Sequence, residues 1–205
     1  MNGTPTGTGT GTNSSRLEYD LGNDVRALEA MANGLVPYVY EDELYGVMPG
    51  NLPRLTVGGL LMRLHRLSAL KDQLSPAQRD IVEAAQKKVD DAREQWHVAY
   101  TGKIKREFKA RVEAIEQYLT ECVESVRGCA ENYPSSMEKR VIVEQLFQEA
   151  VALDELSDDM KKRLPQLDNG IRRFAEPGEF RWDHRLEAVY PRDTYWFLYS
   201  TVKAA

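Results

Sequence analysis

The chain has 205 residues, 42% of them hydrophobic and 29% charged, so it is long enough and apolar enough to bury a core. Its net charge is −5, which excludes a general nucleic-acid coat, because such proteins bind phosphates through an excess of lysine and arginine. No apolar stretch approaches the roughly 20 residues that span a bilayer, so no membrane association is expected.

The first fifteen residues are almost entirely Gly, Thr, Ser and Asn, and they predict a disordered tail. They lack the hydrophobic stretch of a secretory signal, which favours a cytoplasmic location. The predicted organisation is a tail followed by one helical domain, with the boundaries 1–15 (tail), 16–205 (domain), 16–55 (helix and irregular segment), 56–174 (helical bundle) and 175–205 (aromatic cap).

Helix start and stop signals divide the first half of the chain. Apolar spacing predicts a helix over Asn23–Asn33, ended by Gly34, and five prolines and glycines then predict an irregular segment. A second helix is expected over Val57–Leu74. Ser75, followed by a proline and then Gln78, is typical of a capped helix start.

The central prediction is one long amphipathic helix over Pro76–Tyr133, a span without proline. From Phe108 onward its apolar positions recur about every 3.6 residues, close to a coiled-coil seam, whereas before Phe108 the interval is longer. Either the helix breaks near Thr101–Gly102, or it is continuous and its buried face rotates. Segment lengths favour continuity.

The only cysteines, Cys122 and Cys129, would lie about 10.5 Å apart along such a helix, too far for a bridge. They are therefore interpreted as small core residues.

Two further helices and an aromatic segment complete the predicted fold. A capping box at Ser135–Glu138 predicts the start of one helix, and Ser157 predicts the cap of another that is kinked at Pro165. Eight aromatic residues lie beyond Ile171, where one or two short helices are expected. The predicted fold class is all-α: an elongated helical bundle around one long, continuous or kinked, central helix, with an aromatic-rich C-terminal cap.

Two acidic patterns suggest metal-dependent chemistry, and both match poorly. Glu94-x-x-His97 has the spacing found in ferritin-like di-iron bundles, but the second such pair is missing and His97 points away from the apolar stripe. The pairs Glu121/Glu124 and Glu155/Asp158 loosely resemble the magnesium motifs of helical nucleotide pyrophosphohydrolases. No cofactor is therefore expected.

A basic run suggests a nucleic-acid partner, since Lys105, Arg106 and Lys109 share one side of the predicted helix. Nearby acids make a solvated helix face the better interpretation, so nucleic-acid binding is not favoured.

The aromatic segment is the leading candidate for binding a protein partner, because Tyr and Trp dominate interface hot spots. Its candidate residues also suit core packing, and they are Trp182, Tyr190, Tyr195, Trp196 and Tyr199. The sequence thus predicts a non-catalytic helical scaffold or adaptor that associates with a protein or with itself. The alternatives are a helical metal-dependent enzyme and a nucleic-acid-associated protein.

Overall fold

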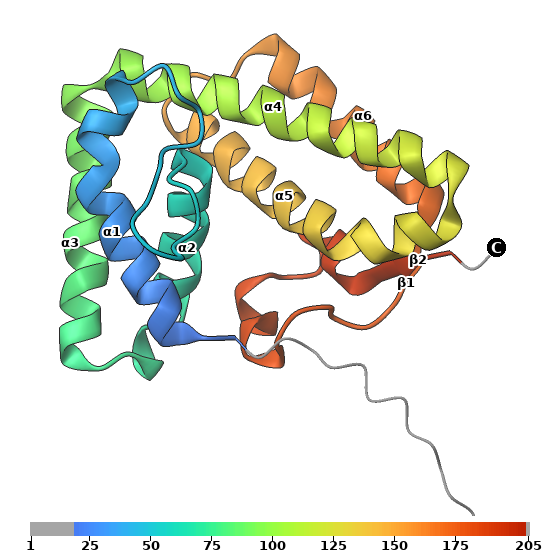
Figure 1. Cartoon of the computed structure of the whole chain (residues 1–205), viewed down its shortest axis with the longest axis horizontal. Helices are drawn as coiled ribbons and strands as arrows, with labels where there is room; N and C mark the ends of the chain where they lie inside the picture. The colour runs from blue at the N-terminus through green and yellow to red at the C-terminus, as the bar shows by residue number, and fades with distance from the viewer. Residues whose placement is uncertain (1–18, 204–205) are drawn as a thin grey trace, which may run out of the picture.

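The computed structural model describes residues 19–203, so the tail predicted for residues 1–15 lies outside the described residues. Figure 1 shows helices that pack around a shared core, with a short two-stranded ribbon near the C-terminus. The elements in chain order are α1 (Leu21–Tyr40), α2 (Val57–Ala69), η1 (Lys71–Gln73), α3 (Pro76–Gln95), α4 (His97–Glu124), α5 (Val126–Ala152), α6 (Asp158–Phe174), β1 (Ala175–Pro177), η2 (His184–Val189), η3 (Trp196–Tyr199) and β2 (Ser200–Val202).

The predicted all-α class is confirmed, but the prediction of one continuous central helix is wrong. Helix α3 ends at Gln95 and α4 begins at His97, because Trp96 leaves helical geometry with φ −127° and ψ 34°. The break lies five residues before Thr101, the position where the sequence suggested one. In Figure 1, α3 runs along one side of the molecule and α4 leaves its end across the top. The lengthened apolar interval before Phe108 therefore marks a corner between two helices.

The chain turns again at Ser125, whose extended backbone ends α4 and whose side chain accepts a hydrogen bond from Gly128 N at the start of α5. Helix α5 then packs back along α4 (Figure 1). The regular seam after Phe108 thus belongs to two facing helices rather than to one. It persists through the turn because both helices bury the same kind of stripe against each other.

Cys122 and Cys129 form a disulfide across this turn, which corrects the prediction that they are separate core residues. Their Cα atoms lie 4.5 Å apart. The estimate of about 10.5 Å assumed one straight helix, and the turn at Ser125 removes that assumption.

Helix α1 extends to Tyr40, past the stop predicted at Gly34. Its last turns bury Leu35 and Tyr38, and this packing outweighs the local signal. A β-carbon at Gly34 would lie 3.1 Å from Leu55 Cδ2, so this glycine lets the segment before α2 pack closely against the helix.

Helix α5 likewise begins at Val126 instead of Ser135, and it runs through Pro134. The exposed proline lies between buried Tyr133 and Met137, whose packing holds the helix together. The caps predicted at Ser75 and Ser157 are confirmed, and Ser75 forms a complete capping box with Gln78.

The C-terminal segment folds as 3-10 turns and an antiparallel ribbon, with Ala175 opposite Val202 and Pro177 opposite Ser200. It is tied to α5 by a hydrogen bond of 2.9 Å from Tyr133 Oη to Phe197 O.

Several charged side chains are buried and paired in this core. Arg140 of α5 is 2% exposed, and it donates hydrogen bonds to Glu144 and to Asp168 of α6. Glu107 of α4 is fully buried and accepts a 2.8 Å hydrogen bond from Gly58 N at the start of α2. Such pairs fix how the helices are arranged. Over residues 19–203, none of the helices combines the length and the apolar character needed to cross a membrane.

The disulfide gives a first prediction. Replacing both cysteines with alanine (C122A/C129A) should lower the free energy of unfolding by about 2 kcal/mol, because the short loop is no longer closed in the unfolded chain. The thermal midpoint should fall by roughly 4–8 °C in calorimetry. A reducing agent should produce the same fall in the wild type and none in the variant. If the reducing agent leaves the thermal midpoint of the wild type unchanged, the disulfide assignment is contradicted.

Candidate functional site

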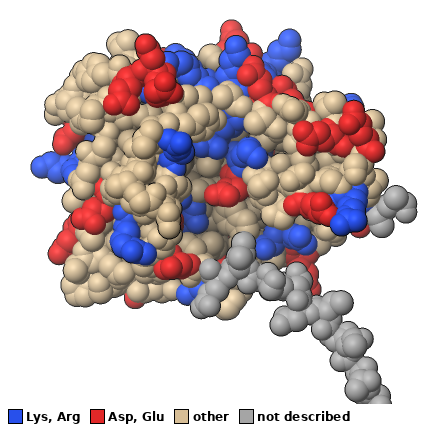
Figure 2. All heavy atoms as spheres, viewed as in Figure 1, with Lys and Arg blue, Asp and Glu red and all other residues tan. Residues whose placement is uncertain are grey.

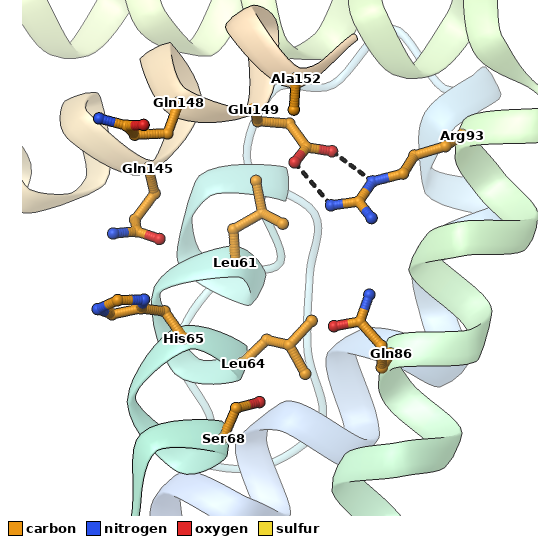
Figure 3. A pocket seen from close by; sticks show the side chains of 10 residues that line it. All are labelled: Leu61, Leu64, His65, Ser68, Gln86, Arg93, Gln145, Gln148, Glu149 and Ala152. Atoms are coloured by element: carbon orange, nitrogen blue, oxygen red, sulfur yellow. Dashed lines mark hydrogen bonds and ion pairs between the residues drawn. The ribbon is translucent and has the colours of Figure 1, made fainter. Parts of the chain in front are cut away.

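An open groove of about 460 Å³ lies between α2, α3 and α5 (Figure 3). Leu61 and Leu64 of α2 point into it from one side, and Gln86 and Arg93 of α3 lie opposite. His65 and Ser68 of α2 also line the groove, and the end of α5 supplies the remaining residues, including Glu149. The groove thus combines an apolar floor with polar walls.

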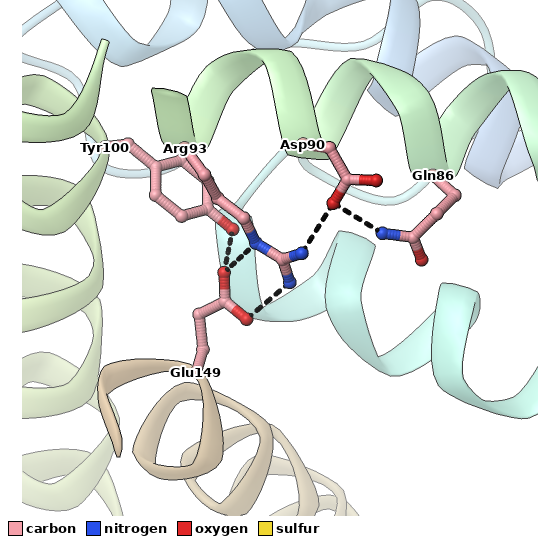
Figure 4. Close-up of polar contacts among 5 residues, drawn as sticks. All are labelled: Gln86, Asp90, Arg93, Tyr100 and Glu149. Atoms are coloured by element: carbon pink, nitrogen blue, oxygen red, sulfur yellow. Dashed lines mark hydrogen bonds and ion pairs between the residues drawn. The ribbon is translucent and has the colours of Figure 1, made fainter. Parts of the chain in front are cut away.

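Glu149 holds one end of the groove together (Figure 4). Its two carboxylate oxygens accept hydrogen bonds from Arg93 Nε and Nη2, both at 2.7 Å. Tyr100 of α4 donates its hydroxyl to the same carboxylate at 2.8 Å. Two parallel N–H bonds to one carboxylate are the strongest geometry of an arginine pair. One side chain of α5 thereby joins α3 and α4.

The network continues along α3. Arg93 Nη1 donates to Asp90 Oδ1 at 2.6 Å, and Gln86 Nε2 donates to the same oxygen at 2.9 Å. The hydrogen bond to Glu149 raises the pKa of the Arg93 guanidinium above its usual value. Burial, together with the Glu149 charge, raises the pKa of the Tyr100 hydroxyl well above its usual value. The Arg93 guanidinium therefore stays charged and the Tyr100 hydroxyl stays protonated near neutral pH.

The glutamines of the groove present their carbonyl oxygens. Gln86 and Gln148 each donate Nε2–H to a carboxylate, of Asp90 and of Glu144 respectively. A carboxylate only accepts hydrogen bonds, so the amide nitrogens must face these partners. The Oε1 atoms therefore remain available to accept hydrogen bonds from a ligand. Gln145 also donates its Nε2, to Tyr195 Oη at 2.7 Å. Each Nε2 also keeps a second hydrogen, so the glutamines line the groove with neutral amides that have a free oxygen acceptor and one remaining N–H donor.

His65 adds another acceptor. Its Nε2 lies 3.2 Å from Val189 O, and because a carbonyl oxygen only accepts, Nε2 carries the hydrogen. Burial lowers the pKa of the imidazole, so the ring is neutral at pH 7 and its Nδ1 keeps a lone pair.

The structure places the predicted aromatic site mostly in the interior. Tyr190, Tyr195 and Tyr199 are buried, with exposed fractions of 0%, 5% and 6%. Trp182 and Trp196 are half-buried; Trp182 meets the Tyr190 ring edge-on, and the Trp196 ring lies 3.7 Å from the Arg172 guanidinium. The tyrosines therefore build the core, and Tyr195 reaches the groove only through its bond to Gln145.

Two of the three residues of the predicted basic patch face acidic side chains, and Arg106 contacts a backbone carbonyl. Lys105 pairs with Glu155 at 2.7 Å, and this hydrogen bond lowers the pKa of the Glu155 carboxyl. Arg106 donates to the Asp42 carbonyl oxygen, and Lys109 lies 3.9 Å from Glu113. Figure 2 shows basic and acidic side chains interleaved on the face it displays.

The two acidic patterns do not assemble into metal sites. His97 faces Glu155 of the segment after α5, with Nε2 and Oε1 2.9 Å apart, rather than Glu94. Across residues 19–203, His, Cys, Asp and Glu side chains form no group of three or more that could hold a metal ion.

Sequence reasoning missed the residues that build the groove. Arg93, Glu149 and the glutamines lie on two helices, α3 and α5, and the long separation of these helices in the chain carries no signal of their proximity. A partial signal is present in α3, where Gln86, Asp90 and Arg93 follow at intervals of four and three, as residues on one helix face do. In comparisons with family models, curated proteins and solved structures, the chain shows no match.

The Arg93–Glu149 pair gives a second prediction. In Glu149→Leu, the Tyr100 hydroxyl loses its acceptor and Arg93 keeps only its contact with Asp90, so the free energy of unfolding should fall by about 2 kcal/mol in urea titrations. The exposed neighbour substitution Glu94→Leu should change it by less than about 0.5 kcal/mol. The double variant Arg93→Met/Glu149→Leu should recover part of the loss, because the guanidinium that lost its Glu149 carboxylate is removed and the half-exposed Asp90 carboxylate stays solvated. Equal effects of the two Glu→Leu changes would contradict the pairing.

His65 gives a third prediction. Because its pKa is lowered in the fold, the unfolded chain binds the proton more readily, and stability is lost as the pH falls through the ordinary value of about 6.5. The thermal midpoint should therefore fall further in the wild type than in His65→Gln between about pH 7.5 and pH 5.5. The matched control is His184→Gln, which removes an exposed ring and should behave like the wild type. Identical pH dependence in His65→Gln and the wild type would refute the assignment.

Proposed function

We propose that this protein is a non-catalytic helical adaptor that binds an extended peptide segment of a protein partner in the groove between α2, α3 and α5. The observation that carries the proposal is the set of glutamine carbonyl oxygens at the groove, left over because the amide nitrogens are held by protein acceptors. An extended peptide offers a row of backbone N–H donors to such acceptors.

The pairing of charges supports a neutral ligand. Binding an anion would call for an unpaired cation in the groove, yet Arg93 is fully engaged by Glu149 and Asp90. Binding a cation would call for an unpaired carboxylate, yet Glu149 already accepts three hydrogen bonds and Glu144 is paired with Arg140. Backbone amides are neutral donors and meet both conditions.

The shape supports a peptide over a compact solute. The groove is open along one side, and Leu61 and Leu64 give it a floor that can receive an apolar side chain. Main-chain hydrogen bonds and side-chain pockets together are how proteins recognise extended segments.

The same contacts support a structural role for Glu149, because Arg93 and Tyr100 occupy both of its carboxylate oxygens. The cytoplasmic location stays a prediction, and the Cys122–Cys129 disulfide weighs against it, because such bonds persist chiefly in oxidising compartments.

The fourth prediction tests the adaptor proposal. A phage-displayed peptide library should yield binders, and the affinity of a selected peptide should fall roughly tenfold in Gln86→Met/Gln148→Met, which keeps side-chain length but removes both acceptors. Fluorescence polarisation would report the affinity. The matched control, Gln117→Met/Gln166→Met, changes two exposed glutamines outside the groove and should bind like the wild type. A library without binders, or unchanged affinity in the groove variant, would sink the proposal.

A further inference from the structure

A second surface lies at the end of the molecule where α4 turns into α5, beside the end of α6 (right side of Figure 1). It contains a shallow depression of about 340 Å³, lined mainly by Leu119, Val123, Gly170 and Phe174. We call this surface the end face. Val123 is 75% exposed, whereas most large apolar side chains of the described residues are buried. The end face therefore carries an apolar knob next to an apolar hollow.

The backbone holds the knob and the hollow in fixed positions. The disulfide between Cys122 and Cys129 fixes the turn immediately beside Val123. On the other side, a β-carbon at Gly170 would lie 2.8 Å from Leu119 Cδ1, so the glycine brings α6 close to α4. A partner would find this surface already formed, which lowers the entropic cost of binding it.

Both signs of charge border the hollow. Glu124 ends α4, where a negative side chain opposes the helix dipole, and no basic residue occupies that last turn. Arg173 lies in the last turn of α6, where a positive side chain is favourable. Among residues 19–203, neither Glu124 nor Arg173 has an ion-pair partner. A cation brought by a partner would offset the unfavourable position of Glu124.

We propose that the end face binds a second copy of this chain about a two-fold axis. Val123 of each copy enters the hollow of the other, and Glu124 of each copy faces Arg173 of its partner. A two-fold contact uses the same patch on both subunits, so the patch has to contain each feature together with its complement. The end face meets this condition in shape and in charge. The contact lies outside the peptide groove, so it adds an assembly step to the adaptor without depending on it.

Charge reversal gives the fifth prediction. Sedimentation velocity and light scattering should show a monomer–dimer equilibrium for the wild type. Arg173→Glu and Glu124→Arg should each weaken it roughly tenfold or more, since like charges then meet twice across the axis. The double variant Glu124→Arg/Arg173→Glu restores opposite charges and should regain most of the affinity. Val123→Asp should give a monomer, because it buries a charge in the hollow.

Lys87→Glu provides the control, because it changes the net charge as much as Arg173→Glu does, at an exposed site on α3. It should dimerise like the wild type. Two results would overturn the proposal: a wild type that stays monomeric up to its solubility limit, or a double variant no better than the single reversals. Neither result touches the peptide affinity of the groove, so this inference and the adaptor proposal fail separately.

Discussion

The arrangement of α3, α4 and α5 depends on the hydrogen bonds that the Glu149 carboxylate accepts from the other two helices. This carboxylate accepts two hydrogen bonds from Arg93 at the end of α3 and one from Tyr100 in the first turn of α4. The chain changes direction between these donors, at Trp96. A carboxylate that is only 6% exposed needs such partners, because an unpaired buried charge is costly. The corner and the pairing therefore stabilise each other, and the groove forms beside them.

The sequence predicted the class of the fold better than its connections. Apolar periodicity indicates which side of a helix is buried. The same spacing arises whether one helix continues straight or two helices are joined by a turn at a single residue. Ser125 and Trp96 are single-residue breaks without the proline or glycine that usually ends a helix, so the sequence from Pro76 onward predicts one continuous helix. At Gly34 the sequence predicts a helix end where the helix continues, because tertiary packing overrides a local stop signal.

The candidate site was harder to predict than the fold. A groove residue is defined by its neighbours in space, and Gln86 and Glu149 become neighbours only after both turns are in place. Aromatic content pointed instead to the C-terminal segment, where Tyr190 and Tyr195 serve the core. Bulk alone does not distinguish a core residue from an interface residue, since both bury large apolar rings. The amide groups that define the groove carry no such compositional signal.

The most direct test of the groove is NMR spectroscopy of the glutamine side-chain amides during titration with a library-selected peptide. Acceptance of peptide N–H groups by the Oε1 atoms should shift the Nε2 signals of Gln86 and Gln148 in step with saturation. The signals of exposed Gln117 and Gln166 should stay in place. Shifts confined to residues outside the groove, with Gln86 and Gln148 unmoved at saturation, would contradict the assignment of the groove as the binding site.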